Sequence, residues 1–413
     1  MLLLYTIGIK IYSAIIWILS FFNEKAALFI SGRKQIFKEI AKKIDPANEN
    51  IWFHFASLGE FEQGRPVLEK FKESHPKKKI VITFFSPSGF EIRKNYALAD
   101  GIFYLPIDSR KNAQHFIELV NPEMAIFTKY EFWYYYFKEL DKKSIPLFIV
   151  SGIFRKDQIF FKDFGGFYRD ILKCVTHFFV QNQESNVLLR SIGMNNITVS
   201  GDTRFDRVFE NAKNPKRISE IELFCADSPI LVCGSTWPDD EKLLAALPAK
   251  YPDWKFIIAP HEIHESHILS IESIFQKTTR FSEFKNTGKN DSAVFIIDNI
   301  GMLSSLYQYG KAAYIGGGFG AGIHNTLEAA AFGLPVIFGP KFNKFQEAKD
   351  LIKIGAAKSV SNASELINAF ENFKNNTQSS LAAKKYVKKN QGATEVILNN
   401  LKKSTSPFPQ ELQ

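Results

Sequence analysis

A cluster of glycines in the last third of the chain has the residue types that bind a nucleotide phosphate. The cluster comprises Gly316, Gly317, Gly318, Gly320 and Gly322, between an apolar run (Ala312–Ile315) and an expected helix (Leu327–Phe332). Glycines at a strand-to-helix turn let backbone N–H groups approach an anion, and a helix N-terminus adds partial positive charge. Glu328, one turn into that helix, can reach sugar hydroxyls. The pattern indicates the nucleotide end of a glycosyltransferase, and the alternative is a Rossmann-type turn that binds no nucleotide.

A second turn of the same kind is expected at Gly234-Ser235-Thr236, between the apolar run Ile230–Cys233 and a helix at Asp239–Leu247. Ser and Thr at a helix start form an anion-binding turn. Asp239 and Asp240 suit the first turn of that helix, where acids complement the dipole.

Three histidines, His261, His264 and His267, lack the HExxH spacing of a zinc site and do not converge on one helical face. We therefore expect no metal there. His261 directly follows an expected strand, Lys255–Ala259, and Pro260, and we expect it to contact a donor phosphate.

Glu60 is the candidate for proton transfer in the first half. It follows an expected strand, Ile51–Ala56, and we expect Ser57 to cap the next helix and Gly59 to permit a tight turn. A carboxylate at a strand end, in a partly apolar crevice, is suited to take a proton from a sugar hydroxyl. The alternative is a capping box, because Glu60 stands three residues after Ser57. The spacing leaves both roles open.

Two further strand ends in this half are polar. Ser86 and Ser88 follow the expected strand Lys79–Phe85, in a loop able to hold a phosphate, and Lys129 and Glu131 follow Met124–Thr128. Together with Glu60, they indicate a binding edge formed by successive strand ends.

Short apolar strands alternate with amphipathic helices from Asn50 onward, which is typical of parallel sheets built from βαβ units. The other expected strands are Gly101–Tyr104, Pro146–Ser151, His177–Gln181, Ile197–Gly201, Ala293–Ile297 and Val336–Phe338. The pattern predicts an α/β protein with two Rossmann-like domains and a ligand cleft between them. We place a membrane anchor at 1–22, an N-terminal domain at 23–210, a C-terminal domain at 211–402 and a flexible tail at 403–413.

The N-terminal segment, Met1–Phe22, is almost wholly apolar and is followed by no cleavage site. Its polar residues fall on one helical stripe: Thr6, Lys10, Ser13 and Ser20. Such a helix could span the bilayer, or lie in the interface with the stripe facing water or its own domain. A basic collar is expected on the cytoplasmic side, from Lys25, Arg33, Lys34, Lys38, Lys42 and Lys43. We interpret the segment as the uncleaved anchor of a cytoplasmic enzyme.

Composition narrows the class of protein. The chain has 413 residues, a formal net charge of +9 and three cysteines, none in a CxxC pair. The cysteines indicate a reducing cytosol. The charge suits an anionic partner, and we find no nucleic-acid signature in the sequence.

The order and spacing of these motifs resemble the bacterial Kdo transferases, which attach 3-deoxy-D-manno-oct-2-ulosonic acid (Kdo) to the lipid A precursor. The matching blocks are Gly32-Arg33-Lys34, HFASLGE (54–60), SPSG (86–89), YLPID (104–108), Glu131-Phe132-Trp133, GDTRFD (201–206), GST (234–236), APH (259–261), DNIGML (298–303) and HNTLEAAAFGLPVIFGP (324–340). The resemblance implies a GT-B fold, an inverting transfer from CMP-Kdo, and neither metal nor other cofactor.

The resemblance also implies roles. The family's general base falls on Glu60, and Glu131 matches an acidic position that helps to place the acceptor. Residues that match the donor-binding loops are Ser235, Thr236, Gly317, Gly318, Asn325 and Glu328. The chain departs from the family at Pro260-His261-Glu262, where Pro-Arg-His is usual, and at Gly322-Ile323, where a second glycine is common. It also departs at Ser151-Gly152-Ile153, where Asn-Ala-Arg is replaced and Arg155 is displaced by two positions.

The implied partners are CMP-Kdo, the lipid A precursor and inner-membrane phospholipids, with the enzyme on the cytoplasmic face of the membrane. One alternative is another membrane-associated GT-B transferase that uses a UDP-sugar on a lipid acceptor. The other is a two-lobed binding protein without catalysis.

Overall fold

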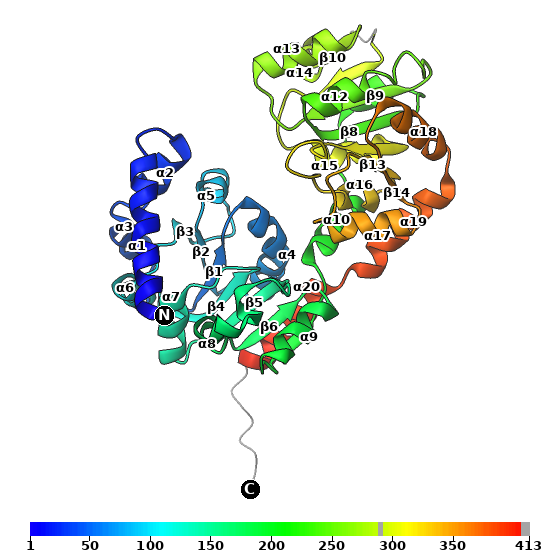
Figure 1. Cartoon of the computed structure of the whole chain (residues 1–413). Coiled ribbons are helices and arrows are strands. Elements are labelled where there is room, and N and C mark those ends of the chain that lie inside the picture. Colours follow the sequence, from blue (N-terminus) through cyan, green and yellow to red (C-terminus); the bar gives the residue numbers. More distant parts are fainter. Residues whose placement is uncertain (288–291, 406–413) are drawn as a thin grey trace. The chain divides into compact units, whose positions relative to one another are not determined.

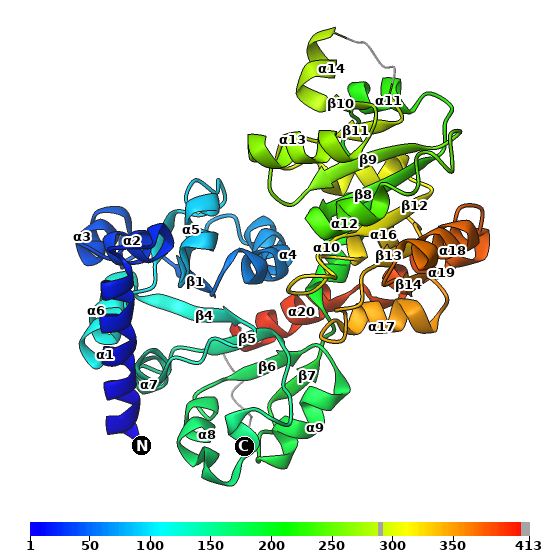
Figure 2. The same ribbon diagram turned by 45° about the horizontal axis from the view of Figure 1, so that its top comes forward.

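The computed structural model of the chain describes residues 1–287 and 292–405. They divide into two compact units, Met1–Asp206 joined by the chain from Gly392 onward, and Arg207–Gln391 (Figures 1 and 2). Each unit contains a parallel seven-stranded sheet. The prediction of two parallel α/β domains is confirmed.

The first unit alternates strands and helices as the sequence pattern predicts. Its strands are β1 (Asn50–Phe55), β2 (Lys79–Phe84), β3 (Gly101–Tyr104), β4 (Pro122–Thr128), β5 (Leu147–Gly152), β6 (His177–Val180) and β7 (Ile197–Val199). Its helices are α1 (Leu2–Leu19), α2 (Glu24–Ser31), α3 (Ile36–Lys43), α4 (Leu58–Ser74), α5 (Pro87–Arg93), α6 (Arg110–Val120), α7 (Tyr134–Lys142), α8 (Gly166–Leu172), α9 (Gln183–Ser191), α20 (Ala393–Thr405) and the start of α10 (Thr203–Lys213).

Helices cover both faces of this sheet, whose strand order is β3-β2-β1-β4-β5-β6-β7. Along β1, Ile51, Phe53 and Phe55 enter the core shared with α4 and α20, whereas Trp52 enters the core shared with α3, α6 and α7. Successive side chains of a strand point to opposite faces, so a strand between two helical layers is apolar throughout. The sequence run NIWFHF of β1 is buried at every position.

The second unit has the strand order β10-β11-β9-β8-β12-β13-β14. Its strands are β8 (Ile230–Thr236), β9 (Lys255–Pro260), β10 (Thr278–Arg280), β11 (Val294–Ile296), β12 (Ala312–Ile315), β13 (Val336–Phe338) and β14 (Ala357–Ser359). Its helices are α11 (Ser219–Cys225), α12 (Pro238–Leu244), α13 (Glu265–Ile274), α14 (Phe281–Thr287), α15 (Leu303–Leu306), α16 (Leu327–Ala331), α17 (Gln346–Lys353), α18 (Ala363–Phe373) and α19 (Thr377–Asn390). The sequence pattern did not reveal β10 and β14, because these edge strands have only three residues each and are mostly incompletely buried.

The C-terminal helix α20 belongs to the first unit, although the sequence boundaries assigned residues 211–402 to the second domain. The Asp206 carboxylate accepts hydrogen bonds from the backbone N–H and the hydroxyl of Thr394, at 2.7 and 2.6 Å, at the start of α20. Ile397 and Leu401 then enter the core beside α4. Amphipathic spacing shows that α20 has a buried face, but it does not show which sheet that face covers.

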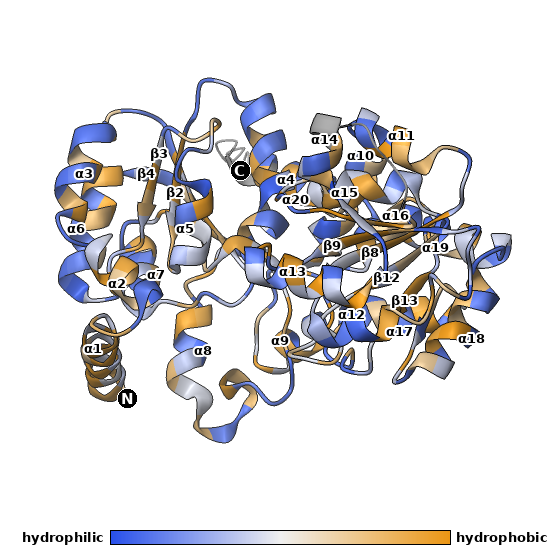
Figure 3. Ribbon diagram, turned by 90° about the horizontal axis from the view of Figure 1, so that it is seen from above, coloured by the Kyte–Doolittle hydropathy of each residue, from blue (hydrophilic) through white to orange (hydrophobic). Residues whose placement is uncertain are grey.

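Helix α1 lies lengthwise on the outside of the first unit, and Figure 3 shows that it is mainly hydrophobic. By length and composition it could cross a membrane, with a mean hydropathy of 1.9 and no buried residue. Its partly buried stripe meets α7 and the end of β3, where the Thr6 and Tyr135 hydroxyls are 2.6 Å apart. The polar stripe therefore faces its own domain at Thr6. Lys10, which belongs to the same polar stripe, is exposed.

Arg33 is not part of a solvent-exposed collar, in contrast to the expectation from sequence. Its guanidinium donates to the carbonyl oxygens of Phe29, Phe85 and Leu105 at 2.7–2.9 Å. Burial lowers the pKa of Arg33 to about 10. Arg33 thus joins α2 to the ends of β2 and β3.

We expect the Tyr5–Asp108 contact to hold α1 in place. The Tyr5 hydroxyl donates to Asp108 Oδ2 at 2.6 Å, and this buried carboxylate also accepts from the backbone N–H groups of Tyr135 and Tyr136, each at 3.2 Å. Tyr5→Phe should lower the free energy of unfolding by about 1–2 kcal/mol, and Asp108→Ala by about 2–4 kcal/mol because it leaves two N–H groups unpaired. Urea denaturation in detergent measures both.

Leu3→Ala serves as the control, because Leu3 is 71% exposed on the same helix. The double variant Tyr5→Phe/Asp108→Ala should be no less stable than Asp108→Ala alone. Additive losses would show that the two residues act independently.

Candidate functional site

The strand order reverses beside one central strand in each sheet. In the first unit β2 and β4 flank β1, and in the second unit β9 and β12 flank β8. Open parallel sheets bind ligands beyond the carboxyl ends of their strands at such a switch point, because the following helices diverge there. The candidates after β1 and β4 and those after β8 and β12 all lie at these positions.

Glu60 lies in the first turn of α4, immediately after β1, and is partly buried. Ser57 occupies the N-cap position, but its hydroxyl donates to Glu60 Oε2 and makes no capping bond to the backbone. The predicted side-chain cap is therefore wrong. Gly59 lies within the helix and not in a tight turn, since α4 begins at Leu58. The result is a carboxylate oriented by a hydroxyl at the edge of the sheet.

The Ser86–Ser88 loop expected from the sequence is the N-cap and first turn of α5 (Pro87–Arg93), and it lies directly beside this helix start. The backbone N–H of Ser86 donates to the carbonyl of Ala56 at 2.8 Å, and the hydroxyls of Ser86 and Ser88 are 2.7 Å apart. A side chain at Gly89 would meet the Phe84 ring at 2.3 Å and the backbone of Ser57 at 3.0 Å. Only glycine permits this close approach, which brings the two predicted loops together.

Glu131 is held by a buried chain of hydrogen bonds. His54 Nε2 and the Trp133 indole Nε1 lie 3.2 and 3.0 Å from Glu131 Oε2. His54 Nδ1 lies 2.8 Å from the Thr83 hydroxyl, which accepts from the Trp52 indole at 2.8 Å. Every group is satisfied when Thr83 donates to Nδ1 and Nε2–H donates to Glu131. The chain fixes the carboxylate through residues of β1 and β2 and through Trp133 in the segment after β4.

The cationic side chains of Arg155 and Arg204 lie near Tyr130 at the same edge. The Arg155 guanidinium lies 5.7 Å from the centroid of the Tyr130 ring. Burial raises the pKa of Tyr130, the charge of Arg155 lowers it, and the charge of Glu60 raises it, so both charged groups lie close to the phenol. Lys129 adopts a left-handed backbone with φ of 62°. Arg155, displaced by two positions from the family pattern, therefore still reaches this edge.

A hydrogen bond between Gln63 and Asp202 joins helix α4, which carries Glu60, to the segment after β7. Asp202 Oδ1 accepts from Gln63 at 2.8 Å, and its Oδ2 accepts from Arg204 at 2.7–2.8 Å. Burial raises the pKa of Asp202, but the Arg204 guanidinium and the Lys129 charge bring it below its ordinary value. Asp202 therefore remains ionised and supports Arg204 beside Tyr130.

In the second unit, three aromatic rings stack after β8, β9 and β12. The His261 ring lies 4.8 Å from Trp237 and 4.4 Å from His324, with interplanar angles near 25°. Trp237 Nε1 donates to His324 Nε2 at 3.1 Å. Burial and the neighbouring His261 lower the pKa of His324 to about 4. The stack presents a neutral His324 and an exposed His261 at the edge.

Thr236 and Gly317 form hydrogen bonds with buried carboxylates of the second unit. The Thr236 hydroxyl is buried and donates to Glu241 at 2.9 Å, and Glu241 accepts from His267 at 3.0 Å. The Gly317 N–H donates to Asp240 at 2.8 Å. Asp240 is thus a buried acceptor that shapes the glycine turn, in addition to its place in the first turn of α12. The sequence analysis assigned Thr236 and Gly317 to binding of the donor substrate. In the structure the Thr236 hydroxyl is bonded to Glu241 and the Gly317 N–H is bonded to Asp240.

The other donor candidates lie around the same turn. Gly318 packs so closely on Gly339 that a side chain there would meet backbone atoms at 2.6 Å. Asn325 accepts from the Leu327 N–H and donates to Glu328 Oε1, both at 3.1 Å, so it orients that carboxylate. Helix α16 has only five residues, fewer than expected, and contributes little dipole. Ser235 has a left-handed φ of 54° at an irregularity of β8.

Several residues at the two edges were not selected from the sequence: His54, Tyr130, Arg155, Trp237 and His324. His54 is the first residue of the block HFASLGE (54–60), and Trp237 directly follows GST (234–236), so their positions in the sequence were a usable signal. The stacking of Trp237 with His261 and His324 joins three loops, and it depends on the order of the strands.

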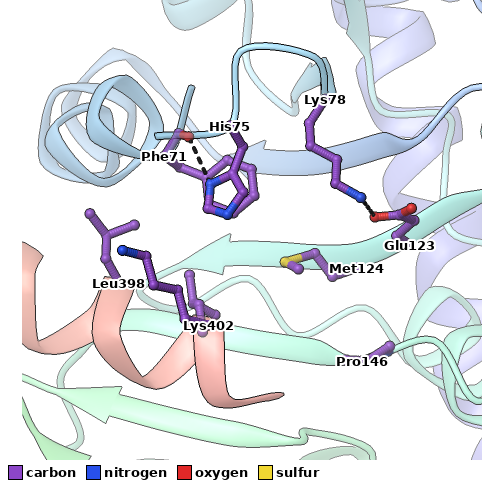
Figure 4. A pocket seen from close by; sticks show the side chains of 9 residues that line it. Phe71, His75, Lys78, Glu123, Met124, Pro146, Leu398 and Lys402 are labelled. Atoms are coloured by element: carbon purple, nitrogen blue, oxygen red, sulfur yellow. Dashed lines mark hydrogen bonds and ion pairs between the residues drawn. The ribbon is translucent and has the colours of Figure 1, made fainter. Parts of the chain in front are cut away.

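Other features of the described residues lie apart from these edges. A pocket of about 340 Å³ opens near the amino ends of β2, β4 and β5 (Figure 4). It is lined by Phe71, His75, Lys78, Glu123, Met124, Pro146, Leu398, Leu401 and Lys402. Within 1–287 and 292–405, no group of three or more His, Cys, Asp or Glu residues is arranged to hold a metal ion.

Known proteins match the chain in sequence and in fold. Residues 31–207 match the family described as 3-deoxy-D-manno-octulosonic-acid transferase (kdotransferase). The Aquifex aeolicus 3-deoxy-D-manno-octulosonic acid transferase is 28% identical over 77% of this chain and 84% of that protein. The Rickettsia prowazekii enzyme of the same name is 26% identical over 88% of this chain and 79% of that protein.

Two solved structures show the same fold at low sequence identity. The UDP-GlcNAc 2-epimerase from Neisseria meningitidis has a TM-score of 0.60 and 15% identity, covering 86% of this chain and 100% of that chain. Acinetobacter baumannii MurG has a TM-score of 0.53 and 12% identity, covering 86% and 99%. The predicted GT-B fold class is confirmed. The sequence matches support a Kdo transferase, and these homologues indicate a glycosyltransferase.

We expect His324 to stay neutral down to about pH 4, which is well below the ordinary histidine pKa of 6.5. The folded protein then binds this proton less readily than the unfolded chain, so its contribution to stability is complete above about pH 6.5 and is lost as the pH falls toward 4. NMR titration of the imidazole measures the midpoint. In Trp237→Phe, which removes the donor to Nε2, the midpoint should rise. A midpoint near 6.5 in the unaltered protein would contradict the burial argument.

Proposed function

We propose that this Kdo transferase moves Kdo from CMP-Kdo to the lipid A precursor at the cytoplasmic face of the inner membrane, with Glu60 as the general base. The observation that supports this most directly is the Glu60 carboxylate itself. It lies at the switch point of the first sheet, oriented by Ser57 and beside the Ser86–Ser88 loop. A base needs both a fixed direction and access to its substrate, and this position offers both.

The reaction is proposed as a single inverting displacement. Glu60 takes the proton of the primary hydroxyl on the non-reducing glucosamine as the hydroxyl oxygen bonds to the Kdo anomeric carbon. The bond from that carbon to the CMP phosphate oxygen breaks, and its electron pair leaves with CMP. The hydrogen bond from Ser57 fixes the direction of the Glu60 carboxylate that is proposed to accept the proton.

The acceptor is proposed to bind the first unit. Glu131, fixed by His54 and Trp133, is positioned to accept a sugar hydroxyl. Ser86 and Ser88 offer hydroxyl donors, and Lys129 and Arg155 offer positive charge to the acceptor's phosphate. A carboxylate that is already hydrogen-bonded loses little entropy when it binds, so it orients the sugar efficiently.

The donor is proposed to bind the second unit. His261 is exposed, and Ser235 lies at the end of β8, so both are placed to donate to the phosphate of CMP. Glu328, oriented by Asn325, is placed to accept ribose hydroxyls. Thr236 and Gly317 act indirectly, by holding Glu241 and Asp240. Preorganised donors stabilise the charge that develops on the leaving phosphate, and we expect no metal requirement.

The first experiment is a mass-spectrometric turnover assay of the full chain in detergent. The acceptor is the tetraacylated disaccharide precursor of lipid A, with CMP-Kdo generated in situ. A gain of one or more Kdo masses supports the proposal and counts the transfers. Transfer from a UDP-sugar in place of CMP-Kdo would favour the alternative GT-B activity instead.

Glu60→Gln should lower kcat by about 10²-fold or more, because glutamine cannot accept the proton. The KM of both substrates should change little, since the amide keeps the size and the contact with Ser57. Initial rates across a range of acceptor concentrations separate the two constants.

Glu73→Gln is the matched control, because Glu73 is an exposed carboxylate near the far end of the same helix. It should retain the activity of the unaltered enzyme. Near-normal turnover in folded Glu60→Gln would exclude Glu60 as the base.

A further inference from the structure

A second pocket of the first unit, of about 320 Å³, lies between α1, α2 and the segment after β2. Its apolar walls are Tyr12, Ile16 and Leu19 of α1, Ala26 and Phe29 of α2, and 85–87. Its volume is within the range of about 300–1,000 Å³ that is usual for small-molecule sites. Because polar atoms form little of the lining, the pocket suits a hydrocarbon better than a polar ligand.

One side of the pocket is continuous with the exposed apolar face of α1. Leu19, which lines the pocket, is 45% exposed, and Ile18 and Phe22 beside it are 53% and 86% exposed. Figure 3 shows this helix on the outside of the unit. Where such a face lies in a membrane interface, a lipid chain can enter the pocket without crossing water.

Phe85, another lining residue of the pocket, connects it to the edge that carries Glu131. The ring of Phe85 packs on Trp133 with centroids 4.7 Å apart, and the Trp133 indole donates to Glu131 at 3.0 Å. Ser86, in the same wall, pairs with Ser88 at 2.7 Å. The wall of the pocket and the predicted acceptor edge therefore share residues.

The floor of the pocket is preformed. The rings of Phe29 and Phe85 meet edge-on at 5.3 Å, and the Arg33 guanidinium lies 3.6 Å from the centroid of Phe29. Arg33 also donates to the carbonyl oxygens of both phenylalanines, at 2.9 and 2.7 Å. A cavity whose walls are fixed in this way need not be ordered by its ligand. At the rim, the exposed Lys25 provides positive charge for a phosphorylated headgroup.

We propose that this pocket binds one acyl chain of the lipid acceptor, while the acceptor's sugar lies at the Glu131 edge. The inference rests on the proposed function and adds a chain-binding subsite to it. The occupant is the acceptor and not a bulk phospholipid, because the wall leads to the residues assigned to the acceptor's sugar. Each methylene buried in the pocket should strengthen binding by about four-fold.

Photocrosslinking tests the occupant without requiring turnover. The full chain, in nanodiscs of phosphatidylethanolamine and phosphatidylglycerol, is irradiated with tetraacylated disaccharide that carries a diazirine on one acyl chain. Peptide mass spectrometry should find label at Ile16, Phe29 or Phe85. Label confined to the exposed face of α1 would overturn the proposal, and so would equal labelling of the pocket by a diazirine phosphatidylethanolamine that the disaccharide does not displace.

Kinetics of a matched pair of variants tests the role of the pocket. Ile16→Trp fills the pocket. Ile15→Trp introduces the same side chain at the preceding position, which is 50% exposed and does not line the pocket. For Ile16→Trp we expect the KM of the tetraacylated acceptor to rise at least about ten-fold with kcat unchanged, and the KM of the O-deacylated acceptor to stay the same. Ile15→Trp should behave as the unaltered enzyme. Equal effects of the two variants would contradict the pocket assignment.

Two further results keep the inference separate from the proposed function. Ile16→Ala enlarges the pocket, and label from a longer acyl chain should then increase there; a decrease would count against the site. Crosslinking in the pocket without any transfer from CMP-Kdo would support the chain-binding site and overturn the donor assignment. Transfer from CMP-Kdo without labelling of the pocket would support the donor assignment and overturn the chain-binding site.

Discussion

The reversal of strand order beside β1 and beside β8 is the constraint on which the candidate sites depend. Parallel strands all end at one edge, and the helices that follow them diverge only where the order reverses. Side chains at that point are open to a ligand while their backbones are held by the sheet. Glu60 and Glu131 occupy this position in the first unit, and Ser235 and Trp237 adjoin it in the second.

Positioning at these edges is achieved by buried polar residues that do not face a ligand. His54 and Thr83 lie in buried strands and direct Glu131, as Asp240 and Glu241 direct the loops after β12 and β8. A buried polar group is costly unless it is paired, so each of these networks permits few alternative arrangements. The networks explain why polar residues occur in otherwise apolar strands of this chain.

The N-terminal helix is part of the first unit and is not merely a tether. Tyr5 and Thr6 join it to Asp108 and Tyr135, and Tyr12 stacks on Phe85. The contact with Phe85 places the helix next to the wall that leads to Trp133 and Glu131. The apolar helix and the edge that carries Glu131 are therefore connected by direct packing.

The sequence by itself determined the parallel α/β architecture, most strand positions and the resemblance to Kdo transferases, because apolar periodicity and glycine-containing turns are local properties. It also located Glu60 and Glu131, which follow strands directly. Only the tertiary structure decided which groups are free to act. Thr236 and Gly317 bond inward to Glu241 and Asp240, Arg33 is half-buried and bonded to backbone carbonyls, and α20 returns to the first unit. These outcomes depend on contacts between residues far apart in sequence, and local spacing carries no information about such partners.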